Sequence, residues 1–246
     1  MRIYGLVGKT LDHSRSEEYF RQKFNNEQIT DAVYRNFAVK HINELPDLII
    51  NNPGIAGLNV TNPYKVEVLS YLDEISPEAG IIGAVNCIKI TREKEKKILK
   101  GFNTDHPAFR ETLKPLLHDR HRKALVLGTG GAAKAICLAL NELKIDFKVV
   151  SRAKNNGDLS YEQLNAKILT DHLIIINATP SGLYPDINSA PPIPYECLTP
   201  DHLLYDLIYN PEETLFLKHG RKAGAKIKNG LEMLHLQAEL SWSIWA

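Results

Sequence analysis

The segment from Lys123 to Ala135 constrains the fold more than any other part of the chain, because it joins a short apolar run to a glycine-rich turn. The apolar residues 125–127 are typical of a parallel strand that is covered on both faces. A turn at 128–131 follows, residues 132–143 have the apolar spacing of a helix, and 147–150 form a second apolar run. Strand, glycine turn, helix and strand make the first half of a dinucleotide-binding fold, in which N–H groups at the helix start bind a pyrophosphate.

The glycine turn departs from the usual G-x-G-x-x-G spacing, since Ala133 stands at the third glycine, and an ordinary strand-to-helix connection is the alternative. The residues after the second strand favour the nucleotide. An NAD enzyme usually has Asp or Glu there to bind ribose hydroxyl groups, whereas this chain has Ser151-Arg152-Ala153-Lys154. Two cations without an acid suit a 2′-phosphate, so we expect Arg152 and Lys154 to select NADP. A solvent-exposed loop is the alternative for both.

Composition excludes several classes of protein. Of the 246 residues, 43% are hydrophobic and 24% charged, which is typical of a soluble globular protein. A net charge of +1 gives no reason to expect nucleic acid or an anionic membrane as a partner. The three cysteines are widely spaced, which favours neither a disulfide framework nor a zinc site, and we expect no metal. The sequence has no signal peptide and no membrane-spanning run, so we expect a cytoplasmic protein.

The chain reads as two α/β units, because strand and helix patterns alternate before residue 103 and again after residue 123. Strands are expected at 3–7, 33–39, 55–60, 84–90, 98–102, 125–127, 147–150, 172–176 and 203–207. Helices are expected at 17–24, 42–50, 66–72, 107–117, 132–143, 212–223 and from 230 onward, the one at 107–117 forming the bridge between the units.

Two strand-to-helix corners carry groups that could act together. Asn62 is a suitable helix cap and Pro63 suits the first helical position, which would put Lys65 in the first turn. The helix dipole favours the neutral form of a lysine there, so Lys65 is a candidate acid or base, with an exposed lysine as the alternative. Asp105 is a natural helix cap as well, and it becomes functional if it pairs with Lys65.

Two further segments contain polar residues with more than one explanation. Ser14-Arg15-Ser16-Glu17 matches a capping box, but two hydroxyl groups at a helix start would equally suit a small carboxylate. In the last helix, Gln237 falls on one stripe with Met233, Leu240 and Ile244. It is either a satisfied core amide or a group that reaches into a cleft.

Taken in chain order, seven motifs resemble those of the shikimate dehydrogenase family. They are Ser14-Arg15-Ser16, Asn59 to Lys65 (N-V-T-x-P-x-K in the family), Gly83 to Cys87 (G-A-V-N-T), Asn103-Thr104-Asp105 (N-T-D), Asn177 to Gly182 (N-A-T-P-x-G), Tyr205 to Pro211, and Met233 to Gln237. The resemblance covers nearly the whole chain.

The resemblance implies reversible, NADPH-dependent reduction of 3-dehydroshikimate to shikimate, with Lys65 as the catalytic lysine and Asp105 as its partner. The substrate ligands that it implies are Ser14, Ser16, Thr61, Asn86, Tyr209 and Gln237. The residues expected to bind NADP are Gly128, Thr129, Gly130, Gly131, Ala132, Ser151, Arg152, Lys154, Asn177, Ala178, Thr179 and Gly230. The other partner is the small-molecule substrate, and the chain is expected to be a monomer or a homodimer.

The implied fold is α/β, with a substrate domain at 1–103 and a Rossmann-like, doubly wound parallel-sheet domain for NADP at 104–230. A cleft between them would hold the active site, and the last helix, 231–246, would pack back on the first domain.

Three positions depart from the family pattern. Cys87 replaces a threonine and Ala108 a glycine, and both leave the reactive groups in place. Ser151 and Ala153 flank Arg152 in place of an N-R-T triplet, so NADP is favoured while the strength of that preference stays open. Two alternatives are a quinate or shikimate dehydrogenase that uses NAD, and a regulatory protein that binds the cofactor without turnover.

Overall fold

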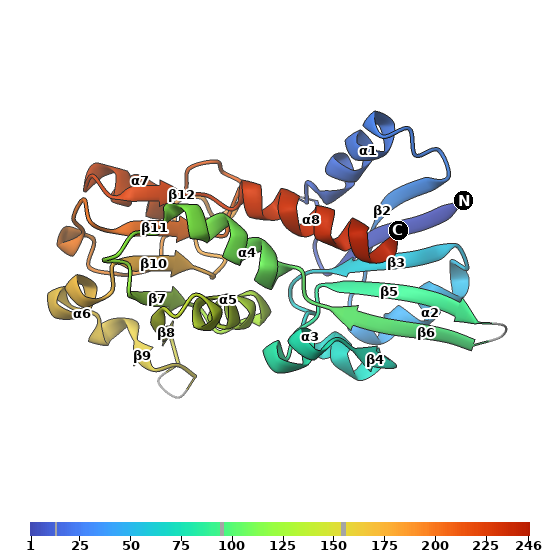
Figure 1. Cartoon of the computed structure of the whole chain (residues 1–246), viewed down its shortest axis with the longest axis horizontal. Coiled ribbons are helices and arrows are strands. Elements are labelled where there is room, and N and C mark those ends of the chain that lie inside the picture. Colours follow the sequence, from blue (N-terminus) through green and yellow to red (C-terminus); the bar gives the residue numbers. More distant parts are fainter. Residues whose placement is uncertain (13, 94–95, 154–155) are drawn as a thin grey trace. The chain divides into compact units, whose positions relative to one another are not determined.

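A computed structural model of the chain describes residues 1–12, 14–93, 96–153 and 156–246 (Figure 1). Two compact units form within it. The first comprises Met1–Asp105 together with His235–Ala246, and the second comprises His106–Leu234. Each unit contains its own six-stranded sheet.

The first unit has a mixed sheet in the order β2-β1-β3-β5-β6-β4. The neighbours β2, β1 and β3 are parallel, whereas β5 runs antiparallel to β3 and β6. Since β5 is reversed, its first residue lies at the same edge as the carboxyl ends of β3 and β6. The elements are β1 (Arg2–Gly8), α1 (Ser16–Asn26), β2 (Ala32–Ala38), the 3-10 helix η1 (Ile42–Glu44), α2 (Leu45–Asn51), β3 (Ile55–Val60), the 3-10 helix η2 (Glu67–Tyr71), β4 (Glu74–Ile75), α3 (Pro77–Ile82), β5 (Cys87–Glu93) and β6 (Lys96–Phe102), with α8 (Leu231–Trp245) joining from His235.

Adjacent strand residues point to opposite faces of this sheet, which gives it two cores. Leu6 belongs to one cluster with Phe20 of α1 and Trp245 of α8. The next residue, Val7, belongs to the other cluster with Leu45 of α2. The last turns of α8 therefore cover the same face as α1.

The second unit has a fully parallel sheet in the order β12-β11-β10-β7-β8-β9. The chain leaves β7 in one direction, through β8 and β9, and returns to the other side of β7 with β10. This reversal is the point at which open α/β sheets bind ligands, outside the carboxyl ends of the strands. The elements are α4 (Asp105–Leu113), the 3-10 helix η3 (Lys114–Leu116), β7 (Lys123–Leu127), α5 (Gly131–Glu142), β8 (Asp146–Ser151), β9 (Leu159–Ser160), η4 (Tyr161–Gln163), α6 (Ala166–Asp171), β10 (Ile174–Asn177), η5 (Tyr195–Cys197), β11 (Leu203–Asp206), α7 (Leu215–Lys222) and β12 (Lys226–Lys228).

The predicted α/β class, with a doubly wound parallel sheet in the second unit, is confirmed. Several predicted elements differ in kind or extent, among them the helix expected at 42–50, which begins as η1 and continues as α2, and the helix expected at 212–223, which is Leu215–Lys222. The helix expected at 66–72 is the 3-10 helix η2, and the strand expected from Ala84 begins only at Cys87, because Gly83 ends α3 with a φ of 65° and a loop follows. The helix expected at 107–117 begins earlier and becomes 3-10 from Lys114, since Pro115 has no N–H to continue α4.

Within the described parts of the chain, no helix combines the length and the apolar character needed to cross a membrane.

Gly57 of β3 makes room for the last turn of α8. A Cβ atom at this position would lie 2.4 Å from Nε1 of Trp245. That nitrogen donates a hydrogen bond to the carbonyl oxygen of Ile88 at 2.9 Å, and the Trp245 ring stacks on Tyr4 with centroids 5.0 Å apart. Any side chain at residue 57 would therefore displace a buried aromatic group from two partners.

We expect Gly57→Ala to destabilise the first unit, because the added methyl group must push Trp245 out of its place. Overpacking costs about 1–3 kcal/mol, which corresponds to a fall in melting temperature of about 2–12 °C for a chain of this size. Thermal unfolding measures the effect. The matched control is Gly80→Ala in α3, where nothing lies within 4 Å of the added atom. Equal melting temperatures for the two variants would contradict this assignment of Gly57.

Candidate active site

Lys65 and Asp105 form the central contact of the site in the first unit. Lys65 lies in the turn after β3 and Asp105 at the start of α4, next to the end of β6. Lys65 Nζ donates to Asp105 Oδ2 at 2.6 Å, and the two side chains are only 13% and 8% exposed. Because this ion pair is largely removed from water, both charges are held in place. A fixed position suits a group that must exchange a proton with one particular atom.

The local structure around Lys65 differs from the prediction. Residues 62–66 form turns, and the helix that follows is the 3-10 helix η2, which begins at Glu67, so Asn62 is not a cap and Pro63 is not a first helical residue. The buried Tyr64 explains the difference, because its hydroxyl group lies 2.9 Å from the carbonyl oxygen of Val39 and 2.7 Å from that of Lys40. This anchor holds the backbone in a turn. The field that acts on Lys65 is therefore that of the Asp105 carboxylate and not that of a helix dipole.

Asn86 holds the second oxygen of Asp105. Its amide nitrogen donates to Asp105 Oδ1 at 2.8 Å and to Thr104 Oγ1 at 2.9 Å, and its Oδ1 accepts from the Thr104 N–H at 2.7 Å. The three groups are buried. The carboxylate of Asp105 is thus bonded on one side by an ammonium group and on the other by an amide.

The serine pair lies at the start of α1 but does not form the predicted capping box. Arg15 occupies the position before the helix, without a side-chain cap among the described residues, and Ser16 is the first helical residue. Ser14 Oγ accepts from the Ser16 N–H at 3.2 Å. Ser16 is buried beside Tyr34, and burial raises the pKa of that phenol well above its usual value, against a smaller lowering by the Ser16 hydroxyl group.

Thr61 and Gln237 belong to the same unit. Thr61 follows β3, and its N–H donates to the carbonyl oxygen of Val7 at 2.9 Å. Gln237 is buried on α8, where the buried stripe continues through Ser241 and Trp245; Leu240 and Ile244, which were expected on it, are half-buried. Ser241 was missed because a serine interrupts an apolar pattern. Tyr209 is half-buried in the second unit, after β11.

In the second unit, the loops after β7 and β10 meet. Gly128 has a φ of 114°, and a Cβ atom on it would lie 3.0 Å from the carbonyl oxygen of Ala178. The Ala178 N–H in turn donates to the carbonyl oxygen of Leu127 at 2.9 Å. Gly130 precedes α5, and apart from its chain neighbours no described atom comes within 4 Å of the place that its Cβ would take. A helix start with N–H groups that lack intrahelical partners, and with space in front of it, fits a pyrophosphate.

Most of the remaining residues predicted to bind the cofactor also contact other parts of the second unit. Ser151 is buried and its Oγ accepts from the Ala153 N–H at 3.2 Å, whereas Arg152 is exposed; Lys154 lies outside the described residues. Asn177 Oδ1 accepts from Thr179 Oγ1 at 2.6 Å. A Cβ atom on Gly230 would lie 2.0 Å from the Leu207 carbonyl oxygen, so close packing alone requires glycine there.

Asp206 supports this edge of the sheet and was not predicted. It pairs with Asn177 across β11 and β10, and its carboxylate accepts from Asn177 Nδ2 at 3.0 Å, the Ile208 N–H at 3.0 Å and Thr214 Oγ1 at 2.5 Å. Burial nevertheless raises the pKa of Asp206 to about 7, against the lowering effect of these hydrogen bonds. The signal in the sequence was an acid at the end of an otherwise apolar strand.

The free energy of unfolding should therefore fall as the pH rises, because Asp206 loses its proton. A carboxyl group whose pKa is raised by folding binds more protons in the folded chain than in the unfolded one between its two pKa values. The contribution of Asp206 to the free energy of unfolding therefore decreases as the pH rises from about 3.8 to about 7, and it is constant above that range. Asp206→Asn keeps a neutral group with similar bonding. We expect the melting temperature of this variant, relative to that of the unchanged protein, to rise over this window. A difference that is independent of pH would contradict the raised pKa.

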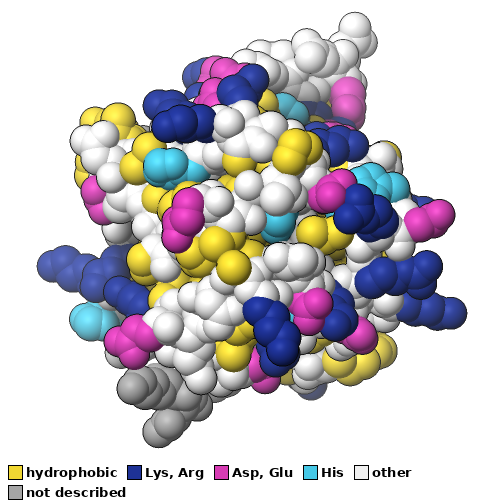
Figure 2. Space-filling model, turned by 90° about the vertical axis from the view of Figure 1, so that its left-hand side faces the viewer, with side chains coloured by type: hydrophobic (Ala, Val, Ile, Leu, Met, Phe, Trp, Pro, Cys, Tyr) yellow, Lys and Arg dark blue, Asp and Glu magenta, His cyan; other side chains and the backbone are white. Residues whose placement is uncertain are grey.

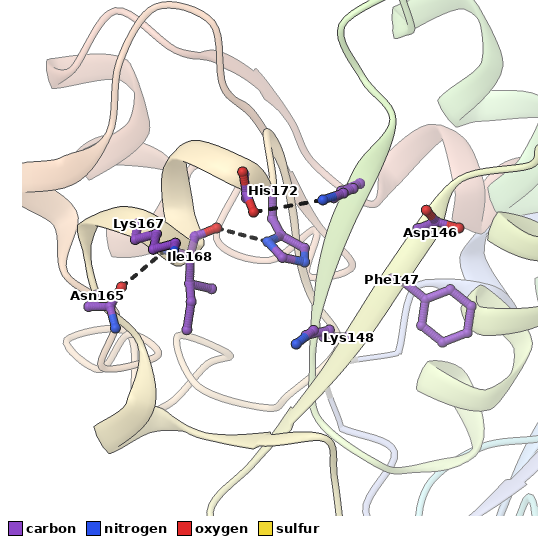
Figure 3. A pocket seen from close by; sticks show the side chains of 9 residues that line it. Asp146, Phe147, Lys148, Asn165, Lys167, Ile168 and His172 are labelled. Atoms are coloured by element: carbon purple, nitrogen blue, oxygen red, sulfur yellow. Dashed lines mark hydrogen bonds and ion pairs between the residues drawn. The ribbon is translucent and has the colours of Figure 1, made fainter.

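A cavity of about 550 Å³ lies at the opposite edge of the second sheet (Figure 3). It is lined by residues at the amino ends of β7 and β8 and by α6, among them Lys123, Lys148 and Lys167. His172 donates its Nδ1–H to the Ile168 carbonyl oxygen at 2.8 Å, and burial, with the neighbouring lysines, lowers its pKa. Figure 2 shows basic and acidic side chains interspersed on the side of the molecule that it presents. None of the predicted site residues that the structure describes lines this cavity.

Comparisons with known proteins agree with the motifs. A family model described as the shikimate dehydrogenase substrate binding domain matches residues 6–88. The chain is similar to a shikimate dehydrogenase (NADP(+)) of Caldanaerobacter subterraneus, with 38% identity over 266 residues that cover 99% of this chain and 91% of that protein.

Solved structures are similar over the whole chain. Shikimate 5-dehydrogenase from Thermus thermophilus, in complex with NADP(H) and shikimate, has a TM-score of 0.86 at 30% identity, with 100% of this chain and 94% of that one covered. The ligand-free 5-ketofructose reductase of a Gluconobacter species has a TM-score of 0.80 at 30% identity, with 99% and 92% covered.

Proposed function

Because the chain belongs to the shikimate dehydrogenase family, we propose that it catalyses the reversible, NADPH-dependent reduction of 3-dehydroshikimate to shikimate. This oxidoreductase reaction is a step in the biosynthesis of aromatic amino acids. The observation that carries the proposal is the 2.6 Å contact between Lys65 and Asp105, since a regulator without turnover needs no buried ammonium–carboxylate pair.

The residues of the second unit fit NADP. The contact of Gly128 with the loop after β10 and the space before α5 suit a pyrophosphate, and the exposed Arg152 suits a 2′-phosphate. We propose that the glycine turn, the loop at 177–179, Ser151, Arg152, Lys154 and Gly230 bind this cofactor. NADP, when bound, carries the hydride that is exchanged with the substrate carbon.

The chain's own residues bind the substrate and move the proton. We propose that Ser14 and Ser16 hold the carboxylate of the substrate, and that Thr61, Asn86, Tyr209 and Gln237 hold its hydroxyl groups. Lys65 then donates a proton from Nζ to the ketone oxygen as negative charge develops on it, and takes the proton back in the reverse direction. Asp105 keeps the ammonium group in place and is itself held by Asn86.

We further propose that residues 1–103 form the substrate domain together with 231–246, and that 104–230 form the cofactor domain. The match of the substrate-binding model to residues 6–88 supports the first assignment. Three unpaired cysteines, Cys87, Cys137 and Cys197, support a reducing compartment, the cytoplasm. We propose a monomer or a homodimer, which sedimentation measures directly.

An assay that crosses two substrates with two cofactors tests the function. We expect turnover with shikimate and NADP, and weaker turnover with quinate or with NAD. Faster turnover of quinate with NAD would support the quinate enzyme, and cofactor binding without turnover on any substrate would support the regulator. Reduction of 5-ketofructose belongs in the same series, because an enzyme with that activity shares the fold.

Lys65→Ala should lower the turnover number about 10²–10⁴-fold, the usual range for a lost general acid, with little effect on cofactor affinity. Asp105→Asn should also be severe, and the double variant should be scarcely worse than the poorer single one, because the two groups act as a unit. Steady-state kinetics at saturating substrate measure all three. The matched control is Lys100→Ala, which breaks an exposed ion pair with Glu74 in the same unit and should leave turnover unchanged. Near-normal turnover of Lys65→Ala would exclude it as the proton donor.

Arg152→Ala should weaken NADP binding about tenfold or more and leave NAD binding nearly unchanged, because a charge-assisted bond to a phosphate contributes about 1.5–3 kcal/mol. Michaelis constants for the two cofactors measure this. Arg120→Ala is the control, since Arg120 is an exposed arginine of the same unit that pairs with Asp201. Equal weakening of NADP and NAD in Arg152→Ala would show that Arg152 does not read the 2′-phosphate.

A further inference from the structure

Ser241 on α8 is the meeting point of three buried segments of the first unit. Its side chain is fully buried. Its Oγ lies 2.9 Å from Asn59 Nδ2, at the end of β3, and 3.2 Å from Thr104 Oγ1, just before α4. It also donates to the carbonyl oxygen of Gln237, one turn earlier on α8, at 2.8 Å.

The protons and lone pairs of each group limit the directions that these hydrogen bonds can take. A serine hydroxyl group has one proton to donate and two lone pairs that accept. The proton goes to Gln237, because a carbonyl oxygen can only accept, and the amide nitrogen of Asn59 can only donate. The second lone pair of Ser241 is therefore open to the proton of the Thr104 hydroxyl group at 3.2 Å, for which Asn86 Oδ1 at 3.3 Å is the other acceptor.

The contacts of Ser241 continue to the pair of Lys65 and Asp105. Thr104 Oγ1 accepts from Asn86 Nδ2, and the other proton of that amide goes to Asp105 Oδ1. On the other side, Asn59 Oδ1 accepts from the Tyr34 hydroxyl group at 2.9 Å, and Asn59 Nδ2 also donates to the Asn86 carbonyl oxygen at 3.2 Å. Ser241 thus joins the helix that carries Gln237 to the groups that hold Asp105.

We propose that Ser241 is a positioning residue for substrate binding. Its hydroxyl group holds the Thr104 side chain beside the Asn86 amide and fixes α8, with Gln237, against the ends of β3 and β6. This role rests on the proposed function, because it assigns Asn86 and Gln237 to the substrate.

Ser241→Ala tests the role, since it removes one oxygen atom and favours the helix. We expect the Michaelis constant for shikimate to rise about threefold to tenfold, as for the loss of one neutral hydrogen bond, while that for NADP stays unchanged. The matched control is Ser243→Ala on the same helix. Ser243 makes the same bond one turn back, to the Glu239 carbonyl oxygen at 3.0 Å, but it is exposed.

The two assays separate a positioning role from a stabilising one. A lower melting temperature with an unchanged Michaelis constant for shikimate would overturn the proposal, as would equal constants for the Ser241 and Ser243 variants. If the unchanged protein itself turned over no shikimate, the proposed function would fail before the variants were compared. Activity in the unchanged protein with no effect of Ser241→Ala would reject the positioning role alone.

A second variant reaches the same hydrogen bond from its other end. Thr104→Val removes the hydroxyl group without altering α8 and should also raise the Michaelis constant for shikimate. Because both residues act through one bond, the double variant should be no worse than the poorer single variant. Effects that multiply would show that Ser241 does not act through Thr104, and the proposal would be wrong.

Discussion

The first unit depends on the need to satisfy the charge of Asp105 away from water. A buried carboxylate without partners is costly, and each oxygen of Asp105 is bonded by a different segment, Oδ2 by Lys65 and Oδ1 by Asn86. The order and direction of the strands in the mixed sheet bring these partners together. Because β5 is reversed, Asn86 comes to the edge at which β3 and β6 end, and three chain segments deliver a cation, an amide and an acid to one place. The polar contacts continue through Thr104 and Ser241 to α8, so that the reactive pair is part of the packing of the unit.

The second unit meets a different requirement, which is to bring backbone groups close to the pyrophosphate that we propose it binds. Its strand order reverses at β7 and β10, and Gly128 lets the two following loops touch. Asp206 holds Asn177 in this loop region at the expense of an unfavourable buried carboxyl group. The proposed cofactor loop and the stability of the unit are therefore linked through a residue that does not itself belong to the glycine motif.

Sequence reasoning located nine of the twelve strands that the structure describes, because apolar runs in a sheet leave a direct pattern. The pairing of Lys65 with Asp105 followed from two corners at one sheet edge. Such reasoning failed where long-range contacts overrode local preference. The turn at 62–66 follows from the anchoring of Tyr64 by Val39 and Lys40, about two dozen residues away. The helices α3 and α6 are too short to show a period, and β4, β9 and β12 span two or three residues. Ser241 and Asp206 look like interruptions of apolar patterns, and only their partners in space give them meaning.

The boundary between the units divides the chain into three sequence segments and has a consequence for synthesis. The second unit is continuous, so all of its strands are synthesised before His235 is added to the chain. The first unit is discontinuous, and the aromatic ring that fills the space beside Gly57 is that of Trp245, which lies in the later of its two segments. Since domains fold as units as they emerge, the nascent first unit has to wait for α8, and until then α1 covers their shared face of the sheet without it. The hydrogen bonds of Ser241 with Asn59 and Thr104 can therefore form only after the whole second unit has been synthesised, and a ribosome that stalls after residue 234 leaves the first unit without them.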